Sequence, residues 1–133
     1  MKVDGYLLDT DCVIHCLKGM REAIEHVRKL EPAVLALSLI TYAELWEGVY
    51  YARDPKASQE KLDEFIANVI MLPVTDAICR RFGQIRGHLR KSGKPTGDFD
   101  LLIAATALEH NLVLISNNRR HFENIHGLRL ESI

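Results

Sequence analysis

The 133-residue sequence has no long apolar run, no strong excess of charge and few cysteines. No stretch approaches the ~20 apolar residues of a membrane span. Acids at positions 4, 9 and 11 interrupt the N-terminal segment, so we expect neither an anchor nor a signal peptide. Seventeen Lys and Arg against eighteen Asp and Glu give a net charge of −1. Any preference for nucleic acid must therefore come from local patches, because the whole chain does not attract polyanions.

The three cysteines, Cys12, Cys16 and Cys79, are odd in number and lack the spacing of a disulfide framework. They favour a reducing compartment, so we expect a cytoplasmic protein. Cys12, His15 and Cys16 could suggest a zinc site, but no second ligand pair follows at finger-like spacing. Buried cysteines on a helix are the preferred interpretation.

Repeats, low-complexity segments and long linkers are also missing, which predicts a single domain over residues 1–133. Short apolar runs alternate instead with longer segments of helical period. The runs are nearly continuous, as in strands buried on both faces of a parallel sheet, and they cover 6–9, 33–37, 69–72, 112–116 and 128–130. The alternation predicts an α/β domain with a mainly parallel sheet of about five strands.

Helix ends are marked by capping residues. Asp11 is expected to cap a helix that ends near Gly19, and a second helix follows over 20–30. Ser38 is expected to cap 39–52, and the pair 54–55 (Asp-Pro) opens another helix. Thr75 or Asp76 should begin a helix that runs to about Ser92, with Gly93 just past its end.

Two acids fall near the carboxyl ends of predicted strands, where α/β sheets bind ligands. Asp9 ends the first strand; it is either a turn residue or functional, and because Asp11 suits the helix cap, the functional interpretation is favoured. Glu44 forms a capping-box pattern with Thr41, but a helix capped by Ser38 would place it almost two turns in. There it either points to solvent or enters a cleft, and the sequence leaves both open.

Asp98 and Asp100 precede an apolar helix, and residues two apart lie about 200° round its axis. We therefore expect Asp98 to cap the helix and Asp100 to project into the cleft. The alternative is that both merely complement the helix dipole. Ser116 and Asn118 add neutral polar groups after the fourth strand, where a simple turn is equally plausible.

Asp9, Glu44 and Asp100 come from separate segments that should meet at one sheet edge. Two carboxylates ~4 Å apart repel by about 4 kcal/mol at an effective dielectric near 20. A divalent cation or a shared proton relieves that repulsion, and all-oxygen ligands favour Mg²⁺ or Mn²⁺. Such an ion suggests attack on a phosphate ester.

Residues 77–97 contain no acid and carry a cluster of basic side chains. This segregation fits a face that contacts phosphates, and a second phosphate contact could follow the fourth strand. The alternative is a solvated helix that meets another subunit or an acidic partner. The candidate residues for these phosphate contacts, which would bind RNA if the chain is a ribonuclease, are Arg80, Arg86, Arg90, Lys94 and Arg119.

Four segments, "LLDT", "TYAELWEG", "GDFDLLIAATALEHNLVLISNN" and "HFENIHGLRLE", occur in the order typical of PIN-domain ribonucleases of the VapC toxin type, which the chain resembles. The resemblance implies a three-layer α/β/α PIN-like fold, a homodimer, and Mg²⁺- or Mn²⁺-dependent RNA cleavage that a cognate VapB-like antitoxin blocks. It implies that Asp9, Glu44 and Asp100 are catalytic metal ligands. Asn118 stands where many PIN domains have a further aspartate; Asp11 is a secondary candidate, with Ser116, Asp98 and Thr41.

Two rival interpretations remain. A hydrophobic strand that ends in Asp-x-Asp also resembles haloacid-dehalogenase-like phosphatases, in which Asp9 would be the nucleophile. The chain is short for that fold, and no acidic pair ends a later strand. The second rival is a non-catalytic module that binds RNA or protein through the acidic cleft and the basic helix.

Overall fold

Five short strands form one parallel sheet in the order β3-β2-β1-β4-β5 in the computed structural model, which describes residues 5–31, 33–93 and 96–132. The strands are β1 (Gly5–Leu8), β2 (Val34–Ser38), β3 (Ile70–Leu72), β4 (Val113–Ile115) and β5 (Leu130–Glu131). All five expected strands are confirmed. The last begins two residues later than expected, because only its end pairs with β4.

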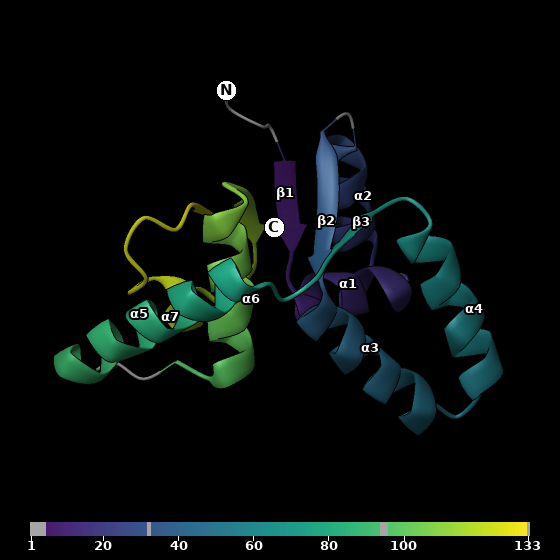
Figure 1. Ribbon diagram of the computed structural model, residues 1–133. Coiled ribbons are helices and arrows are strands. Elements are labelled where there is room, and N and C mark those ends of the chain that lie inside the picture. The colour runs from purple at the N-terminus through teal and green to yellow at the C-terminus, as the bar shows by residue number, and fades with distance from the viewer. Residues whose placement is uncertain (1–4, 32, 94–95, 133) are drawn as a thin grey trace.

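Helices cover both faces of this sheet, so the fold has the expected three layers (Figure 1). One face carries α1 (Thr10–Leu17), α2 (Arg21–Leu30), α3 (Leu39–Tyr51) and α4 (Pro55–Ile66); the other carries α5 (Asp76–Ser92), α6 (Asp98–Glu109) and α7 (Arg119–Phe122). The short α7 was not expected, because one turn with a single buried residue, Phe122, has no period to detect. No helix in the described ranges has the length and apolar character needed to cross a bilayer.

Two apolar clusters hold the layers together, one on each face of the sheet. Adjacent strand residues point to opposite faces, so Leu7 joins the α5–α6 side and Leu8 joins the α1–α4 side. Both are fully buried, which explains why the strands read as continuous apolar runs. The alanines of α6 are also fully buried, and their small side chains let this helix approach the sheet closely.

Most predicted helix starts are confirmed: the side chains of Ser38, Asp54 and Thr75 cap α3, α4 and α5. The prediction for Asp11 was wrong. Asp9 caps α1 instead, and its Oδ1 accepts a hydrogen bond from the Cys12 backbone N at 2.8 Å. The reason is that β1 ends at Leu8, which leaves Asp9 in extended conformation directly before the helix.

The prediction that Asp98 caps α6 was also wrong. Gly97 occupies the N-cap position and provides no side-chain cap. Asp98 already lies in the first helical turn, and its carboxylate forms an ion pair with Arg86 of α5. The expectation that only Asp100 enters the cleft is confirmed, because Asp98 faces α5 while Asp100 lines a cavity.

The strand order fixes where a ligand site is expected. From β1 the sheet extends through β2 to β3 on one side and through β4 to β5 on the other. The order therefore reverses between β1 and β4, and ligands of such sheets bind outside the carboxyl ends at this switch point. Asp9 follows β1 there, and its backbone N donates to the Ile115 carbonyl of β4 at 3.1 Å.

Candidate active site

A cavity of about 440 Å³ opens at the switch point between β1 and β4. Its lining comes from the β1–α1 junction, α3, the start of α6 and the segment after β4. The lining residues are Asp9, Thr10, Asp11, Ile14, Glu44, Glu47, Gly48, Tyr51, Asp100, Asn118 and His121. The three acids predicted to meet at one sheet edge thus share one cavity.

Asp9 is the most deeply placed of these acids, with 4% of its surface exposed. The N-terminus of α1 holds its carboxylate through Cys12, and the Ser116 hydroxyl adds a second hydrogen bond. Burial raises the pKa of Asp9, and the nearby charges of Asp11 and Asp100 raise it further, against the opposing effect of the two hydrogen bonds. The ionised form of the Asp9 carboxyl group is therefore destabilised in the folded protein.

Glu44 enters the cavity rather than pointing to solvent, which settles the alternative that the sequence left open. The Thr10 hydroxyl donates to its Oε1 at 2.6 Å, and Thr10 Oγ1 also lies 3.2 Å from Oγ1 of the fully buried Thr41. Burial raises the pKa of Glu44, the hydrogen bond from Thr10 lowers it, and three surrounding carboxylates, led by Asp100, raise it again.

Two further acids, Asp100 and Asp11, are each held by a side chain from the segment after β4. Nδ1 of His121 lies 2.7 Å from Oδ2 of Asp100. Nδ2 of Asn118 donates to Oδ2 of Asp11 at 2.6 Å, while the Asn118 backbone N donates to the hydroxyl of the buried Ser116 at 3.0 Å. His121 thus holds Asp100, and Asn118, itself bonded to Ser116, holds Asp11.

The donor set fits a hard cation in its chemistry, because carboxylate oxygens are the ligands that Mg²⁺ and Mn²⁺ prefer. In their present orientations, however, no three His, Cys, Asp or Glu side chains of the described ranges form a group that could hold an ion. The carboxylates of four of these acids are instead directed at protein donors, namely those of Asp9, Asp11, Glu44 and Asp100. Ion binding would therefore require some of these side chains to reorient, and Glu44 and Asp100 each have a second carboxylate oxygen besides the one that contacts Thr10 or His121.

The predicted RNA-binding residues occupy different surroundings. Arg80 pairs with Asp76 on its own helix at 2.7 Å. Arg86 donates to the Thr96 carbonyl at 2.8 Å, pairs with Asp98 and lies over the Phe82 ring, so its guanidinium holds the start of α6 in place. Arg90 and Arg119 are exposed on α5 and α7. Lys94 lies outside the described residues.

Among the lining residues that the sequence did not identify, two contact the acids directly. Thr10 stands between two acids, and its position opposite Glu44 depends on how α1 and α3 pack. His121 follows the fourth strand, where the sequence predicted no more than a further phosphate contact. Its pairing with Asp100 depends on the unexpected α7 and on Thr96, whose hydroxyl donates to the His121 carbonyl at 3.2 Å.

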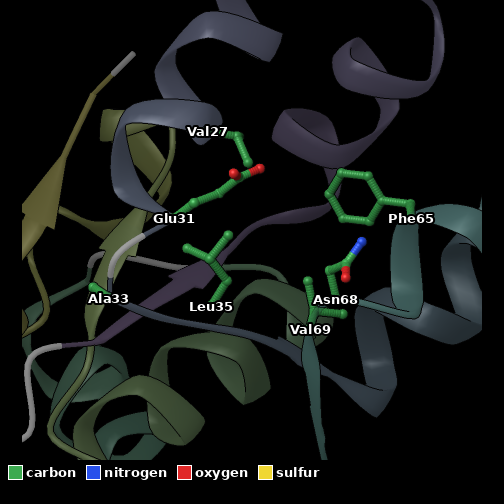
Figure 2. Close-up of a pocket in the computed structure, with 7 residues that line it drawn as sticks. All are labelled: Val27, Glu31, Ala33, Leu35, Phe65, Asn68 and Val69. Carbon is green, nitrogen blue, oxygen red and sulfur yellow. The ribbon is translucent and has the colours of Figure 1, made fainter.

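A second cavity, of about 430 Å³, lies between α2, the beginning of β2 and the end of α4 (Figure 2). Phe65 and Asn68 face Val27 and Glu31 across it. It contains none of the predicted site residues, and one carboxylate among apolar side chains does not provide a metal centre. The acidic cavity at the switch point is therefore the candidate active site.

Comparison with known proteins agrees with this geometry. Residues 6–128 match the PIN domain family. A tRNA(fMet)-specific endonuclease VapC of Shigella flexneri is 30% identical over 95% of this chain and 96% of its own. A ribonuclease VapC1 of Haemophilus influenzae is 36% identical over 93% and 94%. The crystal structure of VapBC2 from Rickettsia felis, bound to a DNA fragment from their promoter, superposes with a TM-score of 0.91 at 29% identity, over 97% of this chain and 98% of that one.

The chain therefore belongs to the PIN-domain family. Within it, the near full-length similarity to the VapC proteins places the chain among the VapC ribonucleases of toxin–antitoxin systems.

The raised pKa of Asp9 leads to a prediction about Asp9→Asn, which removes the buried charge and keeps a good N-cap residue. The pKa of Asp9 is higher in the folded protein than its ordinary value of 3.8, so protonation of Asp9 favours the folded state. This stabilisation is fully present below pH 3.8 and is lost as the pH rises through the pKa of the folded protein. Without divalent metal, the variant should therefore melt at a higher temperature than the parent near pH 7. The difference should shrink as pH falls below 4, as measured by calorimetry in EDTA; a difference independent of pH would contradict the assignment.

Proposed function

We propose that this VapC-family ribonuclease hydrolyses RNA phosphodiester bonds in the acidic cavity, with Mg²⁺ or Mn²⁺ held by Asp9 and Asp100 and with Glu44 as a ligand or as the group that orients the attacking water. The observation that carries the proposal is the convergence of these three acids, from the β1–α1 junction, α3 and α6, on one cavity at the switch point. When bound, the ion supplies stabilisation of negative charge and a lower pKa for its water.

The protein's own groups prepare this chemistry. The cap of α1 and Ser116 fix the orientation of Asp9, and Thr10 fixes that of Glu44. The raised pKa of Glu44 suits a group that takes a proton from water, since a general base works best when its pKa approaches the working pH. Asn118 supports Asp11 as a neutral donor and adds no further charge.

The two rivals fare differently. A phosphatase of the haloacid-dehalogenase type is set aside, because the chain belongs to the PIN-domain family. The non-catalytic module is the alternative outcome of the next experiment. The cytoplasmic location expected from the cysteines stays a prediction.

Asp100→Asn should reduce the rate of RNA cleavage by at least about 100-fold, because loss of a metal ligand costs more than the 10–100-fold typical of residues that support one. Cleavage of labelled RNA is measured with Mg²⁺, with Mn²⁺ and with EDTA. Mn²⁺ should also raise the melting temperature of the parent more than that of the variant.

The matched control is Asp98→Asn, on the same helical turn, because Asp98 has a largely exposed carboxylate that pairs with Arg86 and does not line the cavity. It should cleave RNA at nearly the parental rate, while the residual cleavage by Asp100→Asn, purified in parallel, measures contaminating nuclease. Equal rates for Asp100→Asn and the parent would end the assignment, and RNA binding without metal-dependent cleavage would favour the non-catalytic module.

The basic helix α5 is proposed to contact the RNA backbone through its exposed cations, and Arg90 and Arg86 give a paired test. Arg90→Ala should leave the melting temperature unchanged and reduce the slope of log affinity against log salt by about 0.7, the value of one contact with single-stranded RNA. Arg86→Met should instead destabilise the fold by about 1–3 kcal/mol, because it removes charge-assisted hydrogen bonds from a guanidinium that is 17% exposed. An unchanged salt slope for Arg90→Ala would remove it from the RNA surface.

A VapB-like antitoxin is the proposed partner, since the Rickettsia felis structure and a Klebsiella pneumoniae structure are toxin–antitoxin complexes. A mainly apolar groove of about 500 Å³ between α1, α3 and α4 continues the acidic cavity, because Ile14, Glu44 and Gly48 line both. An antitoxin segment with apolar anchors and a basic residue would fit both parts. The implied homodimer stays a prediction that sedimentation of the purified chain would test.

Ala52→Gln, which extends a polar side chain at the end of the groove, should weaken antitoxin binding about tenfold without lowering the melting temperature. The control is Ala67→Gln, another alanine at a helix C-cap, which does not line the groove. Calorimetric titration with the antitoxin from the same operon measures both. Equal affinities for the two variants would place the antitoxin elsewhere.

A further inference from the structure

Tyr51 is 86% exposed, the largest fraction among the exposed large hydrophobic side chains of the described residues, and it lines the acidic cavity. It ends α3, and the cavity residues of this helix, Glu44, Glu47, Gly48 and Tyr51, follow helical spacing. Seven residues separate Glu44 from Tyr51, or roughly 10 Å along the helix axis. A Cβ on Gly48 would meet nothing within 4 Å, so no side chain fills the space beside Gly48, between Glu44 and the Tyr51 ring.

The composition of the lining determines how an RNA strand can be held there. Five carboxylates line the cavity, and among the described lining residues there is no Lys or Arg. A phosphate in this cavity is therefore not held by a lysine or arginine side chain. The large apolar surfaces on offer belong to Ile14 and Tyr51, and these suit the base of a nucleotide better than its phosphate.

The neighbouring Tyr50 shows what is special about Tyr51. Tyr50 is 75% exposed, but its ring packs against Trp46 with centroids 5.6 Å apart, and it does not line the cavity. Tyr51 makes no such ring contact with the described part of the chain. Its ring is therefore accessible at the edge of the candidate active site.

We propose that Tyr51 stacks on one nucleobase of the RNA beside the bond that is cut, and so places the strand across the acids. The inference rests on the proposed ribonuclease function, because it needs RNA as the substrate. Stacking on an aromatic ring accepts any base, and it holds a single strand without a cation at that point. Tyr51 is thus a substrate-positioning residue and takes no part in the chemical step.

Tyr51→Ala should raise KM for a short labelled RNA by roughly 5- to 100-fold, the loss typical of one stacked base, with kcat within about twofold. Tyr51→Phe and Tyr51→Trp should keep the parental KM, since both retain a ring. The matched control, Tyr50→Ala, removes a tyrosine of similar exposure from the same helix end and should leave KM unchanged. A Tyr51→Ala enzyme with the parental KM would overturn the inference.

A scan of substrates with one abasic nucleotide identifies the contact directly. In the parent, one abasic position beside the cut should raise KM by the same factor as Tyr51→Ala, and in the variant that position should have no further effect. Additive losses at every position would overturn stacking. If Tyr51→Ala weakens antitoxin binding or self-association while KM for RNA stays parental, the ring is a protein contact and the inference fails.

Failure of the ribonuclease proposal gives a different result. In that case the parent itself cuts no RNA, whatever stands at position 51. Binding of fluorescent RNA to Asp100→Asn, with and without Tyr51→Ala, measures the contact without cleavage. A roughly 5- to 100-fold weaker affinity in the double variant supports stacking, and equal affinities overturn it.

Discussion

The burial of several carboxylates close together at the carboxyl edge of the sheet is the constraint on which the rest of this structure depends. Asp9 and Glu44 both have raised pKa values, with burial as the first cause and other carboxylates adding to it. Such a group of acids lowers the stability of the fold at neutral pH unless donors or a cation balance it. The fold accepts this cost at the switch point of its sheet, where function is expected.

The donors that balance the charge come from separate elements, and this ties the site to the fold. The amino end of α1 donates a hydrogen bond to Asp9, Thr10 donates one to Glu44, and His121 of α7 pairs with Asp100. The last contact is itself supported from a distance: Arg86 of α5 holds the carbonyl of Thr96, whose hydroxyl holds the carbonyl of His121. A basic residue expected to bind RNA is thereby a part of the scaffold behind an acid.

The sequence predicts the layers well because strand burial and helix capping are local signals. Leu7 and Leu8 face opposite cores, so their run reads as a strand buried on both faces, and Ser38 and Thr75 mark helix starts by residue type alone. The functional site could be predicted from the sequence only in part. Asp9 both caps α1 and lines the cavity. The sequence analysis missed this dual role because it gave the cap to Asp11 and the functional role to Asp9. The pairing of His121 with Asp100 joins segments whose proximity no local pattern encodes.

The distribution of charge separates the cavity from the surface around it. Acids line the cavity, whereas the exposed cations Arg90 and Arg119 lie on α5 and α7 outside that lining. Cations inside the cavity would neutralise the acids and compete with a metal for them, so phosphate attraction has to act from outside. In the proposed mechanism, an ion held by the acids would contact the scissile phosphate, and the apolar surface in the cavity would contact a base. Under this proposal, the residues that would bind the RNA backbone differ from those that would align the scissile bond.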